Sequence, residues 1–283
     1  MDLRTSYFNL LKRKGLYKIV HPLYRWELAR EGGYTTVLSF PKSGRSWLRF
    51  MLCEAQRLAT GLPIERFIFD VPDRRRELPK FYFVHGVSPH EDLDAYHYRR
   101  IETGGPGGIV FLIRDPIKAL ASFYQHLKSR KFHGMMIDDD LPFMDFLTSE
   151  QIGLPKYIAF LDYYLDLLER KAVPHLMVKY EDMRDQTFHE LSRILAFGGL
   201  SLSPAEIEQA IDAASFDKMR RIEENRTYQV GWLLPGKQGR HASYKTRGAF
   251  LKDRFEAYDS AAKDYALSRM GESNLLKQLG YLA

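Results

Sequence analysis

The chain has 283 residues, of which 45% are hydrophobic and 28% are charged. This composition is typical of a globular protein, and it excludes a collagen-like or largely disordered chain. The single cysteine excludes an internal disulfide scaffold, and the net charge of +6 suits an anionic ligand without requiring one.

The N-terminal segment, residues 1–33, mixes charged and apolar residues and lacks the apolar block of a secretory signal. No run in the chain approaches the roughly 18 apolar residues that a membrane span needs. We therefore expect a cytoplasmic protein with a helical N-terminal extension. That helix either packs on the body of the protein or makes weak peripheral contact with an anionic membrane surface through its basic residues.

Four short apolar runs predict buried strands of a parallel sheet, because they do not alternate polar with apolar residues. They are Thr35–Phe40, Phe81–His85, Gly108–Ile113 and His175–Lys179. Three- and four-residue apolar spacing predicts helices at Ser46–Thr60, Pro116–Arg130, Pro155–Arg170 and Thr187–Phe197. Asp115 is expected to cap the second of these helices and Gly61 to end the first.

The alternation of strands and helices indicates a single α/β domain over residues 1–283, with a central parallel sheet flanked by helices. Two long stretches are expected to be loops, His85–Pro106 and residues 227–250. Loops of this length are typically functional lids or mobile segments, so residues 227–250 are predicted to be a mobile cofactor or substrate loop.

The sequence FPKSGRSW, residues 40–47, joins the first predicted strand to the first predicted helix. Gly44 allows a tight turn, and the backbone N–H groups of the turn would lie at the positive end of the helix dipole. Lys42 and Arg45 add charge, and Ser43 and Ser46 add hydroxyl donors. The segment predicts an anion-binding turn, with an ordinary polar strand–helix turn as the alternative. It is not a Walker A motif, because the lysine precedes the glycine.

A second motif lies at the carboxyl end of the third predicted strand, where α/β sheets bind ligands. Arg114 offers a planar fork suited to phosphate, and Ser122, eight residues later, adds a donor from the following helix. The alternative is a salt bridge between Arg114 and Asp115 that only caps the helix.

After the fourth strand, Glu181 and Asp182 could be a catalytic carboxylate pair. Neighbouring side chains on an extended backbone point in opposite directions, however, which favours a structural role.

Together and in this order, these segments resemble the sulfotransferases that use 3′-phosphoadenosine 5′-phosphosulfate (PAPS). The family's phosphosulfate loop, YPKSGTxW, appears here as FPKSGRSW, its 3′-phosphate pair as Arg114 and Ser122, and its YED as residues 180–182. The similarity covers roughly residues 35–248. It implies a P-loop NTPase-like sulfotransferase fold. The implied donor-binding residues are Lys42, Ser43, Gly44, Arg45, Ser46, Trp47, Arg114, Ser122, Tyr180, Ser215, Phe216, Arg247 and Gly248.

The resemblance also implies how the reaction proceeds. A sulfuryl group passes in line from PAPS to an acceptor hydroxyl and leaves 3′-phosphoadenosine 5′-phosphate (PAP), with no metal. His85 would be the general base, with His90 and His97 as second choices, and Lys42 would neutralise the leaving oxygen. Trp47 and Phe216 would sandwich the adenine.

Two positions depart from the family pattern. Phe83 stands where the family often has a lysine that helps to hold the sulfuryl group. The last family motif, RKGxxGxW, is matched only by Arg247 and Gly248, and residues 236–240 are a rival for the same contacts.

Two other function classes are less well supported by the sequence. A P-loop kinase would need a Walker A lysine and an acidic Mg²⁺ ligand, neither of which is evident. A non-catalytic nucleotide-binding protein of the same fold would not need both His85 and Lys42. Asp138–Asp140 is interpreted as a solvated turn before a helix that begins at Leu141, not as a metal site. The expected acceptor is a small-molecule alcohol or phenol, a carbohydrate or a lipid, but not a nucleic acid. Neither its identity nor the oligomeric state follows from the sequence.

Overall fold

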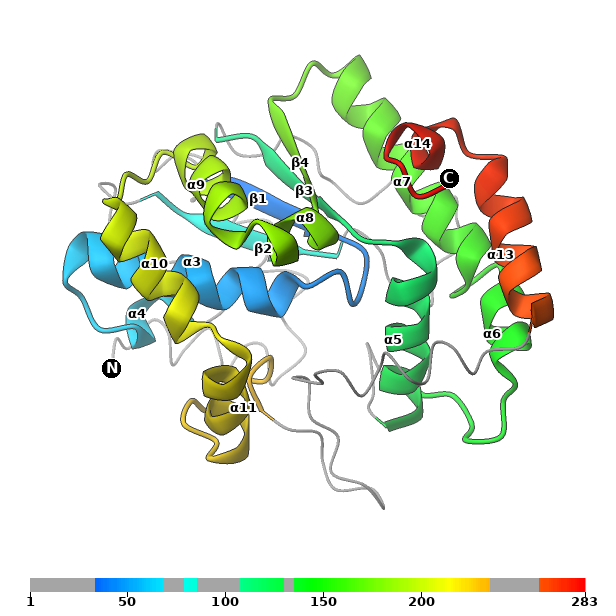
Figure 1. The fold of residues 1–283 in the computed structure, drawn as a ribbon, viewed down its shortest axis with the longest axis horizontal. Helices are drawn as coiled ribbons and strands as arrows, with labels where there is room; N and C mark the ends of the chain where they lie inside the picture. Colours follow the sequence, from blue (N-terminus) through cyan, green and yellow to red (C-terminus); the bar gives the residue numbers. More distant parts are fainter. Residues whose placement is uncertain (1–33, 69–78, 86–106, 130–134, 235–259, 283) are drawn as a thin grey trace, which may run out of the picture.

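A parallel sheet of four strands, in the order β2-β1-β3-β4, lies between two groups of helices (Figure 1). The computed structural model describes residues 34–68, 79–85, 107–129, 135–234 and 260–282. The extension predicted at residues 1–33 and most of the two predicted long loops lie outside the described residues. The strands are β1 Thr35–Ser39, β2 Phe81–Val84, β3 Ile109–Ile113 and β4 His175–Lys179. The predicted fold class is confirmed, and each strand agrees with its predicted bounds to within one residue.

The described residues contain eleven helices. Their bounds are α3 Arg45–Thr60, α4 Glu65–Ile68, α5 Pro116–Ser129, α6 Phe143–Thr148, α7 Leu154–Arg170, α8 Tyr180–Asp185, α9 Thr187–Phe197, α10 Pro204–Ala213, α11 Phe216–Glu224, α13 Ser260–Gly271 and α14 Asn274–Gln278. None of these helices is both long and apolar enough to cross a membrane.

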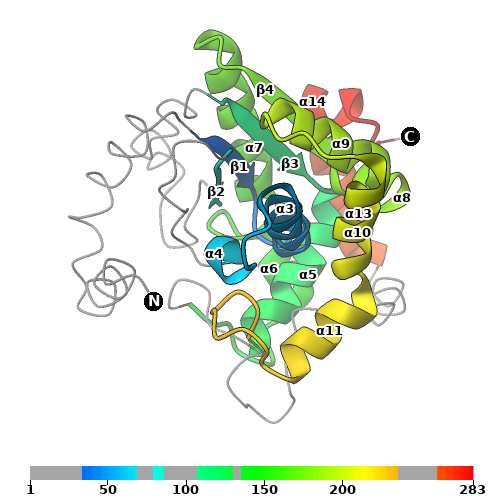
Figure 2. The same cartoon turned by 90° about the vertical axis from the view of Figure 1, so that its left-hand side faces the viewer.

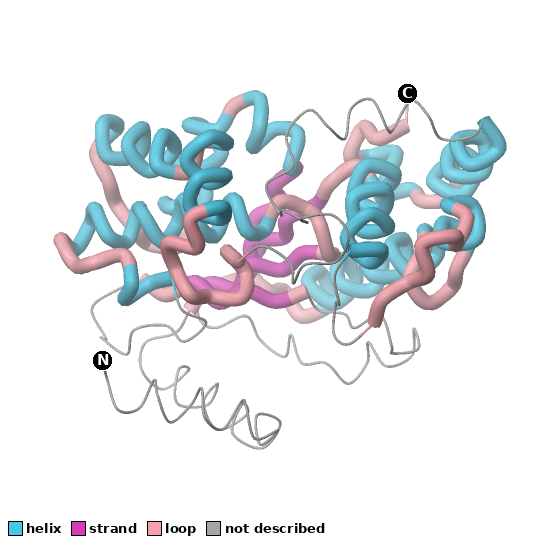
Figure 3. The backbone as a smooth tube through the Cα atoms, turned by 90° about the horizontal axis from the view of Figure 1, so that it is seen from below, coloured by secondary structure: helices cyan, strands magenta, loops and turns pink. Residues whose placement is uncertain are grey.

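Alternate residues of the central strands supply the two hydrophobic cores. In β3, Phe111 packs with α5, α6, α7 and α13 on one face of the sheet, while Val110 and Leu112 pack with α3, α9 and α10 on the other. Figure 3 shows the strands between these two groups of helices. Figure 2 shows α3 almost end on, with α10 beside it. Burial on both faces explains why the strands are continuously apolar.

The prediction that all four strands are buried holds only for β1 and β3. Both are buried at every residue, whereas the edge strands β2 and β4 have only Phe81 and Val178 buried. A short apolar run does not reveal whether its strand will be central or at an edge, because strand order depends on the crossover connections.

Local signals at helix ends were more informative. The Asp115 carboxylate accepts hydrogen bonds from the N–H groups of Ile117 (2.9 Å) and Lys118 (3.2 Å), which confirms it as the cap of α5. Gly61 ends α3 with a left-handed φ of 66°, as predicted. Asp138–Asp140 form an exposed turn, but the helix that follows begins at Phe143 and not at Leu141. Within the described ranges, no three His, Cys, Asp or Glu side chains are grouped so as to hold a metal ion.

Candidate active site

The turn between β1 and α3 has an unusual backbone. Lys42 has a φ of 69° and Gly44 a φ of 91°, so both are left-handed. Glycine adopts this conformation without strain, but a lysine seldom does, and such residues concentrate at functional sites. Helix α3 begins at the next residue, Arg45. The start of a helix is a common place for a bound anion, because its first N–H groups have no carbonyl one turn earlier in the helix to pair with.

The aromatic ring of Tyr180, the first residue of α8, lies directly against this turn. A Cβ added to Gly44 would lie 2.4 Å from Tyr180 Cδ2 and 2.7 Å from Cε2. The ring also meets Trp47 edge-on, with centroids 6.2 Å apart. The first and third motifs of the sequence are thus in contact, and glycine is required where they meet.

Arg114 connects the second motif to the other two. Its Nη1 donates to the Lys42 carbonyl oxygen (2.8 Å), and its Cζ lies 4.4 Å from the centroid of the Tyr180 ring. Its Nε is buried and has no hydrogen-bond partner among the described residues. Arg114 therefore braces the strained turn while it retains a donor for a ligand. The carboxylate of Asp115 instead pairs with Lys118 (3.2 Å), so helix capping does not account for Arg114.

The serine hydroxyls of this region are mostly buried. Ser43 is fully buried in the turn, and its Oγ has no hydrogen-bond partner among the residues that the structure describes. Ser46 and Arg45 are half-buried in the first turn of α3. Ser122 is buried in the second turn of α5, and its pairing with Arg114 toward one ligand stays a prediction.

Trp47 links α3 to the residues expected at the adenine. Its Nε1 donates to the Ala214 carbonyl oxygen (3.0 Å), just before Ser215 and Phe216 at the start of α11. The Phe216 side chain is 49% exposed, although a ring of this size is usually covered. The structure thus brings Trp47 close to this turn, and the sandwiching of an adenine by the two rings stays a prediction.

His85 follows β2, beside the end of β1. Its Nδ1 lies 3.3 Å from the Ser39 carbonyl oxygen. A proton on Nδ1 would be donated to this carbonyl, which places the basic electron pair on Nε2.

A cation lies next to Phe83 even though the family lysine is absent. The Arg49 guanidinium is 5.1 Å from the Phe83 ring centroid and 4.3 Å from the Trp232 ring. It also donates to the Ile68 carbonyl oxygen (3.3 Å), as does the indole N–H of Trp232 (3.0 Å). Arg49 carries no sequence signal of its own, because it lies within α3, outside any motif, and its aromatic partners are far away in the chain.

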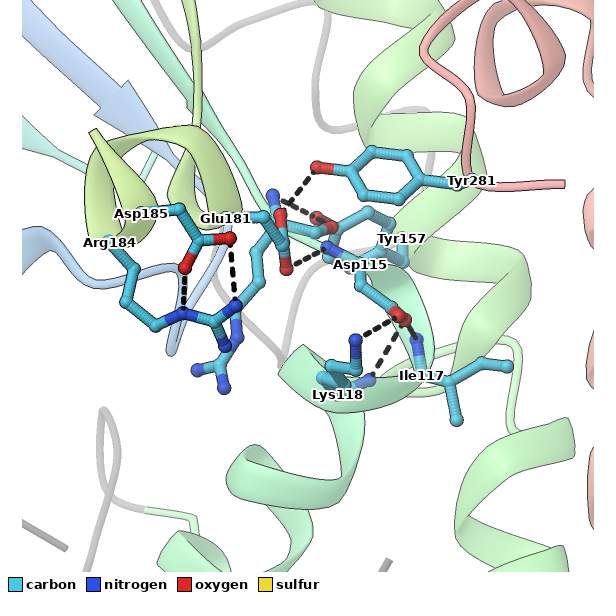
Figure 4. Close-up of polar contacts among 9 residues, drawn as sticks. Asp115, Ile117, Lys118, Tyr157, Glu181, Arg184, Asp185 and Tyr281 are labelled. Carbon is cyan, nitrogen blue, oxygen red and sulfur yellow. Dashed lines mark hydrogen bonds and ion pairs between the residues drawn. The ribbon is translucent and has the colours of Figure 1, made fainter. Parts of the chain in front are cut away.

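One premise about residues 180–182 was wrong. They form the first turn of α8 and are not extended. The Glu181 carboxylate nevertheless accepts hydrogen bonds from the Asp115 N–H (3.2 Å) and from the hydroxyl of Tyr281 (2.9 Å), which favours the predicted structural role. Figure 4 shows Glu181 between these two groups. The same role for Asp182 stays a prediction. Sequence reasoning gave no role to Tyr281, which is 100 residues from Glu181.

Several predicted site residues lie outside the described residues. They are His90, His97, Arg247, Gly248 and residues 236–240. Their assignments therefore remain predictions.

Comparison with known proteins identifies the family of this chain. The sulfotransferase domain family model matches residues 34–248. Flavonol 3-sulfotransferase of Flaveria bidentis is 24% identical over 212 residues, covering 67% of this chain and 65% of that protein. Sulfotransferase 2A1 of Homo sapiens is 23% identical over 203 residues, covering 65% of each. The chain thus spans about 65% of the length of these curated relatives.

Solved structures share the fold. The crystal structure of mouse sulfotransferase SULT7A1 complexed with PAP has a TM-score of 0.60 at 16% identity, with 88% of each chain covered. A retinol dehydratase in a complex with retinol and PAP has a TM-score of 0.54 at 16% identity, with 84% of this chain and 80% of that chain covered. On the match over residues 34–248, the chain belongs to the sulfotransferase domain family.

Proposed function

We propose that this chain is a PAPS-dependent sulfotransferase that moves a sulfuryl group to an acceptor hydroxyl. The observation that supports it most directly is the setting of Arg114, whose guanidinium contacts both the Lys42 carbonyl and the Tyr180 ring and keeps a buried Nε without a partner in the described part of the chain. An arginine so placed suits a phosphate. The two solved structures with a similar fold were determined with PAP bound, which supports the proposal that this chain binds the same nucleotide.

The donor nucleotide is proposed to lie along the carboxyl edge of the sheet. The turn amides and the side chains of Ser43, Arg45 and Ser46 hold the 5′-phosphosulfate at the start of α3. Arg114 and Ser122 hold the 3′-phosphate, with Arg247 and Gly248 as further ligands. The adenine lies among aromatic groups and the start of α11. The residues assigned to it are Trp47, Tyr180, Ser215 and Phe216.

Transfer occurs by in-line displacement at sulfur. The acceptor oxygen forms a bond to sulfur as the bond between sulfur and the bridging oxygen of the nucleotide breaks. The Nε2 of His85 takes the acceptor proton, and PAP leaves with its new charge neutralised by Lys42. Both groups flank the end of β1, since His85 contacts the Ser39 carbonyl and Lys42 lies three residues beyond it.

The acceptor is proposed to be a small-molecule alcohol or phenol, a carbohydrate or a lipid. The relatives support a small molecule, because one is named for a flavonol and another, from Cavia porcellus, for a 3-alpha-hydroxysteroid. The domain limits, a cytoplasmic location and the absence of a metal requirement remain predictions. A labelling assay with PAPS or ATP as the donor, each with and without a chelator, distinguishes this proposal from a kinase. Labelling of an acceptor by ATP that a chelator abolishes would contradict the proposal.

The donor site is tested by calorimetric titration of PAP and of adenosine 5′-phosphate, which lacks the 3′-phosphate. The wild type should prefer PAP by a factor on the order of 10³, because a charge-assisted hydrogen bond contributes roughly 1.5–3 kcal/mol and more than one would be lost. Arg114→Ala should remove most of that preference. Because Arg114 also braces the turn, both affinities should fall in this variant, so the ratio between them is the informative quantity.

Arg170→Ala is the matched control, since this arginine is exposed on α7 and pairs with Asp166. It makes the same change in net charge and should leave the ratio at its wild-type value. An unchanged ratio in Arg114→Ala would remove Arg114 from the 3′-phosphate site.

A further inference from the structure

The C-terminal end of the described chain reaches the candidate donor site through Tyr281. The Tyr281 hydroxyl donates to one oxygen of the Glu181 carboxylate (2.9 Å), and the other oxygen accepts the N–H of Asp115 (3.2 Å). In Figure 4, Glu181 lies between Tyr281 and Asp115. Three segments that are far apart in the sequence thus meet at one carboxylate.

The group that this carboxylate holds is the peptide that follows Arg114. The carbonyl oxygen of that peptide accepts a hydrogen bond from the buried Tyr157 hydroxyl (2.7 Å), and its N–H is the donor to Glu181. The peptide between Arg114 and Asp115 is therefore fixed at both of its polar ends. Because the Arg114 side chain projects from one end of this peptide, its direction depends on both contacts.

The chemistry of the cluster keeps Tyr281 in the role of donor. Burial, reinforced by the neighbouring Glu181 charge, raises the pKa of the Tyr281 phenol, so the hydroxyl stays protonated. The Lys179 ammonium group lies 5.1 Å from the centroid of the Tyr281 ring and holds its face. Without the hydroxyl, one oxygen of Glu181 would lose its hydrogen-bond donor. The Glu181 carboxylate would then be able to turn away from the Asp115 N–H and toward the Arg114 guanidinium.

We propose that Tyr281 is a positioning residue of the donor site: it fixes Glu181, which fixes the Arg114–Asp115 peptide and so aims Arg114 at the 3′-phosphate. The C-terminal segment thereby completes the nucleotide site without touching the nucleotide. This inference rests on the proposed function, because it takes Arg114 to be the 3′-phosphate ligand.

The test is Tyr281→Phe, which removes only the hydroxyl. Calorimetry should show PAP binding weakened about ten-fold, in keeping with the loss of one hydrogen bond to a charged group. Binding of adenosine 5′-phosphate should weaken much less than binding of PAP, because that ligand has no 3′-phosphate for Arg114 to meet and loses affinity only as far as the turn loosens. In turnover assays the donor KM should rise while kcat at saturating donor stays near wild type. Tyr265→Phe, which removes a hydroxyl from α13, is the control and should leave both affinities unchanged.

A double-mutant cycle checks that the effect passes through Glu181. In a Glu181→Gln background, Tyr281→Phe should change the ratio of the two affinities much less than it does in the wild type, because the charge that the hydroxyl restrains is gone. Equal effects in the two backgrounds would overturn the proposal. Equal weakening of both nucleotides by Tyr281→Phe would also overturn it, since that would indicate a general loss of structure.

Arg114→Ala separates this inference from the proposed function. If Arg114→Ala leaves the ratio at the wild-type value, the 3′-phosphate assignment fails, and the inference fails with it. If Arg114→Ala removes the preference while Tyr281→Phe preserves it, only the positioning role of Tyr281 is wrong.

Discussion

Substituting Gly44 by alanine tests the contact between the first and third motifs. The new methyl group would meet two ring atoms of Tyr180 at 2.4 and 2.7 Å, well inside van der Waals contact. The ring has little room to retreat, because it is packed against the guanidinium of Arg114 and the edge of Trp47. Either the ring or the turn must therefore shift, and both belong to the proposed donor site.

The cost has two parts that can be separated. A left-handed φ costs alanine roughly 1–2 kcal/mol, and forcing a methyl group into a packed site costs roughly 1–3 kcal/mol more. Gly61, at the other end of α3, has a φ of 66° but nothing within 4 Å of a new Cβ. Gly61→Ala therefore shows the first part alone, and both variants share the same gain from a stiffer unfolded chain.

Urea unfolding of the two variants gives the comparison. Gly44→Ala should lower the free energy of unfolding by about 1–3 kcal/mol more than Gly61→Ala does, and only Gly44→Ala should weaken PAP binding. In a Tyr180→Ala background this difference should largely disappear. Equal losses for the two glycine variants in the wild-type background would refute the tight contact with Tyr180.

Four further outcomes are expected. Lys42→Ala should lower kcat about 10²–10³-fold in a labelled-donor assay, with a smaller loss of PAP affinity; a kcat near that of the wild type would contradict its role. His85→Asn should lower kcat about 10²-fold with donor affinity unchanged. If His90→Asn loses activity and His85→Asn keeps it, His85 is not the general base. Burial raises the pKa of Cys53 to about 12, so iodoacetamide at neutral pH should label it only after unfolding, and rapid labelling of native protein would disprove this. Because the folded pKa of Tyr281 is raised above an unfolded value of about 10, its contribution to stability is complete below pH 10 and declines above it by up to roughly 1.4 kcal/mol per pH unit. In urea unfolding measured at several pH values above 10, the free energy of unfolding of Tyr281→Phe should fall less steeply with pH than that of the wild type. Identical slopes for the two proteins would exclude this contribution.

Features that depend on local interactions were predicted from the sequence, whereas features that depend on contacts between distant segments were not. Strand runs, helix periods and the Asp115 cap are local signals. The four strands, the four helices predicted from apolar spacing and the Asp115 cap agree with the structure to within one residue. The backbone of residues 180–182 was wrong because α8 begins directly after β4, without a loop or glycine to mark the change from strand to helix. Propensity alone does not resolve such a junction, because tertiary contacts decide it.

The structure brings the three predicted motifs together because they lie at strand ends that share one edge of the sheet. What the sequence did not reveal are the contacts between motifs. Arg114 binds a main-chain carbonyl at Lys42, and any residue at position 42 would supply that acceptor. The bond between Tyr281 and Glu181 spans 100 residues, and nothing in either side chain alone indicates its partner. The Arg49 stack on Phe83 and Trp232 likewise depends on chain segments that meet only in the fold.

The strand order also separates the two halves of the proposed reaction. The order β2-β1-β3-β4 places His85 on one side of the β1 turn, and Arg114 with Tyr180 on the other. In the proposed site, the proton acceptor and the 3′-phosphate ligand would thus lie on opposite sides of the turn that is assigned to the phosphosulfate. Changes at the β2 end should therefore lower kcat and leave PAP affinity intact, whereas changes at the β3 and β4 ends should do the reverse. Since Phe83 and Arg49 lie at the β2 end, Arg49→Met should reduce turnover at saturating donor far more than it reduces PAP binding, and a loss confined to PAP binding would contradict this division of the sheet edge.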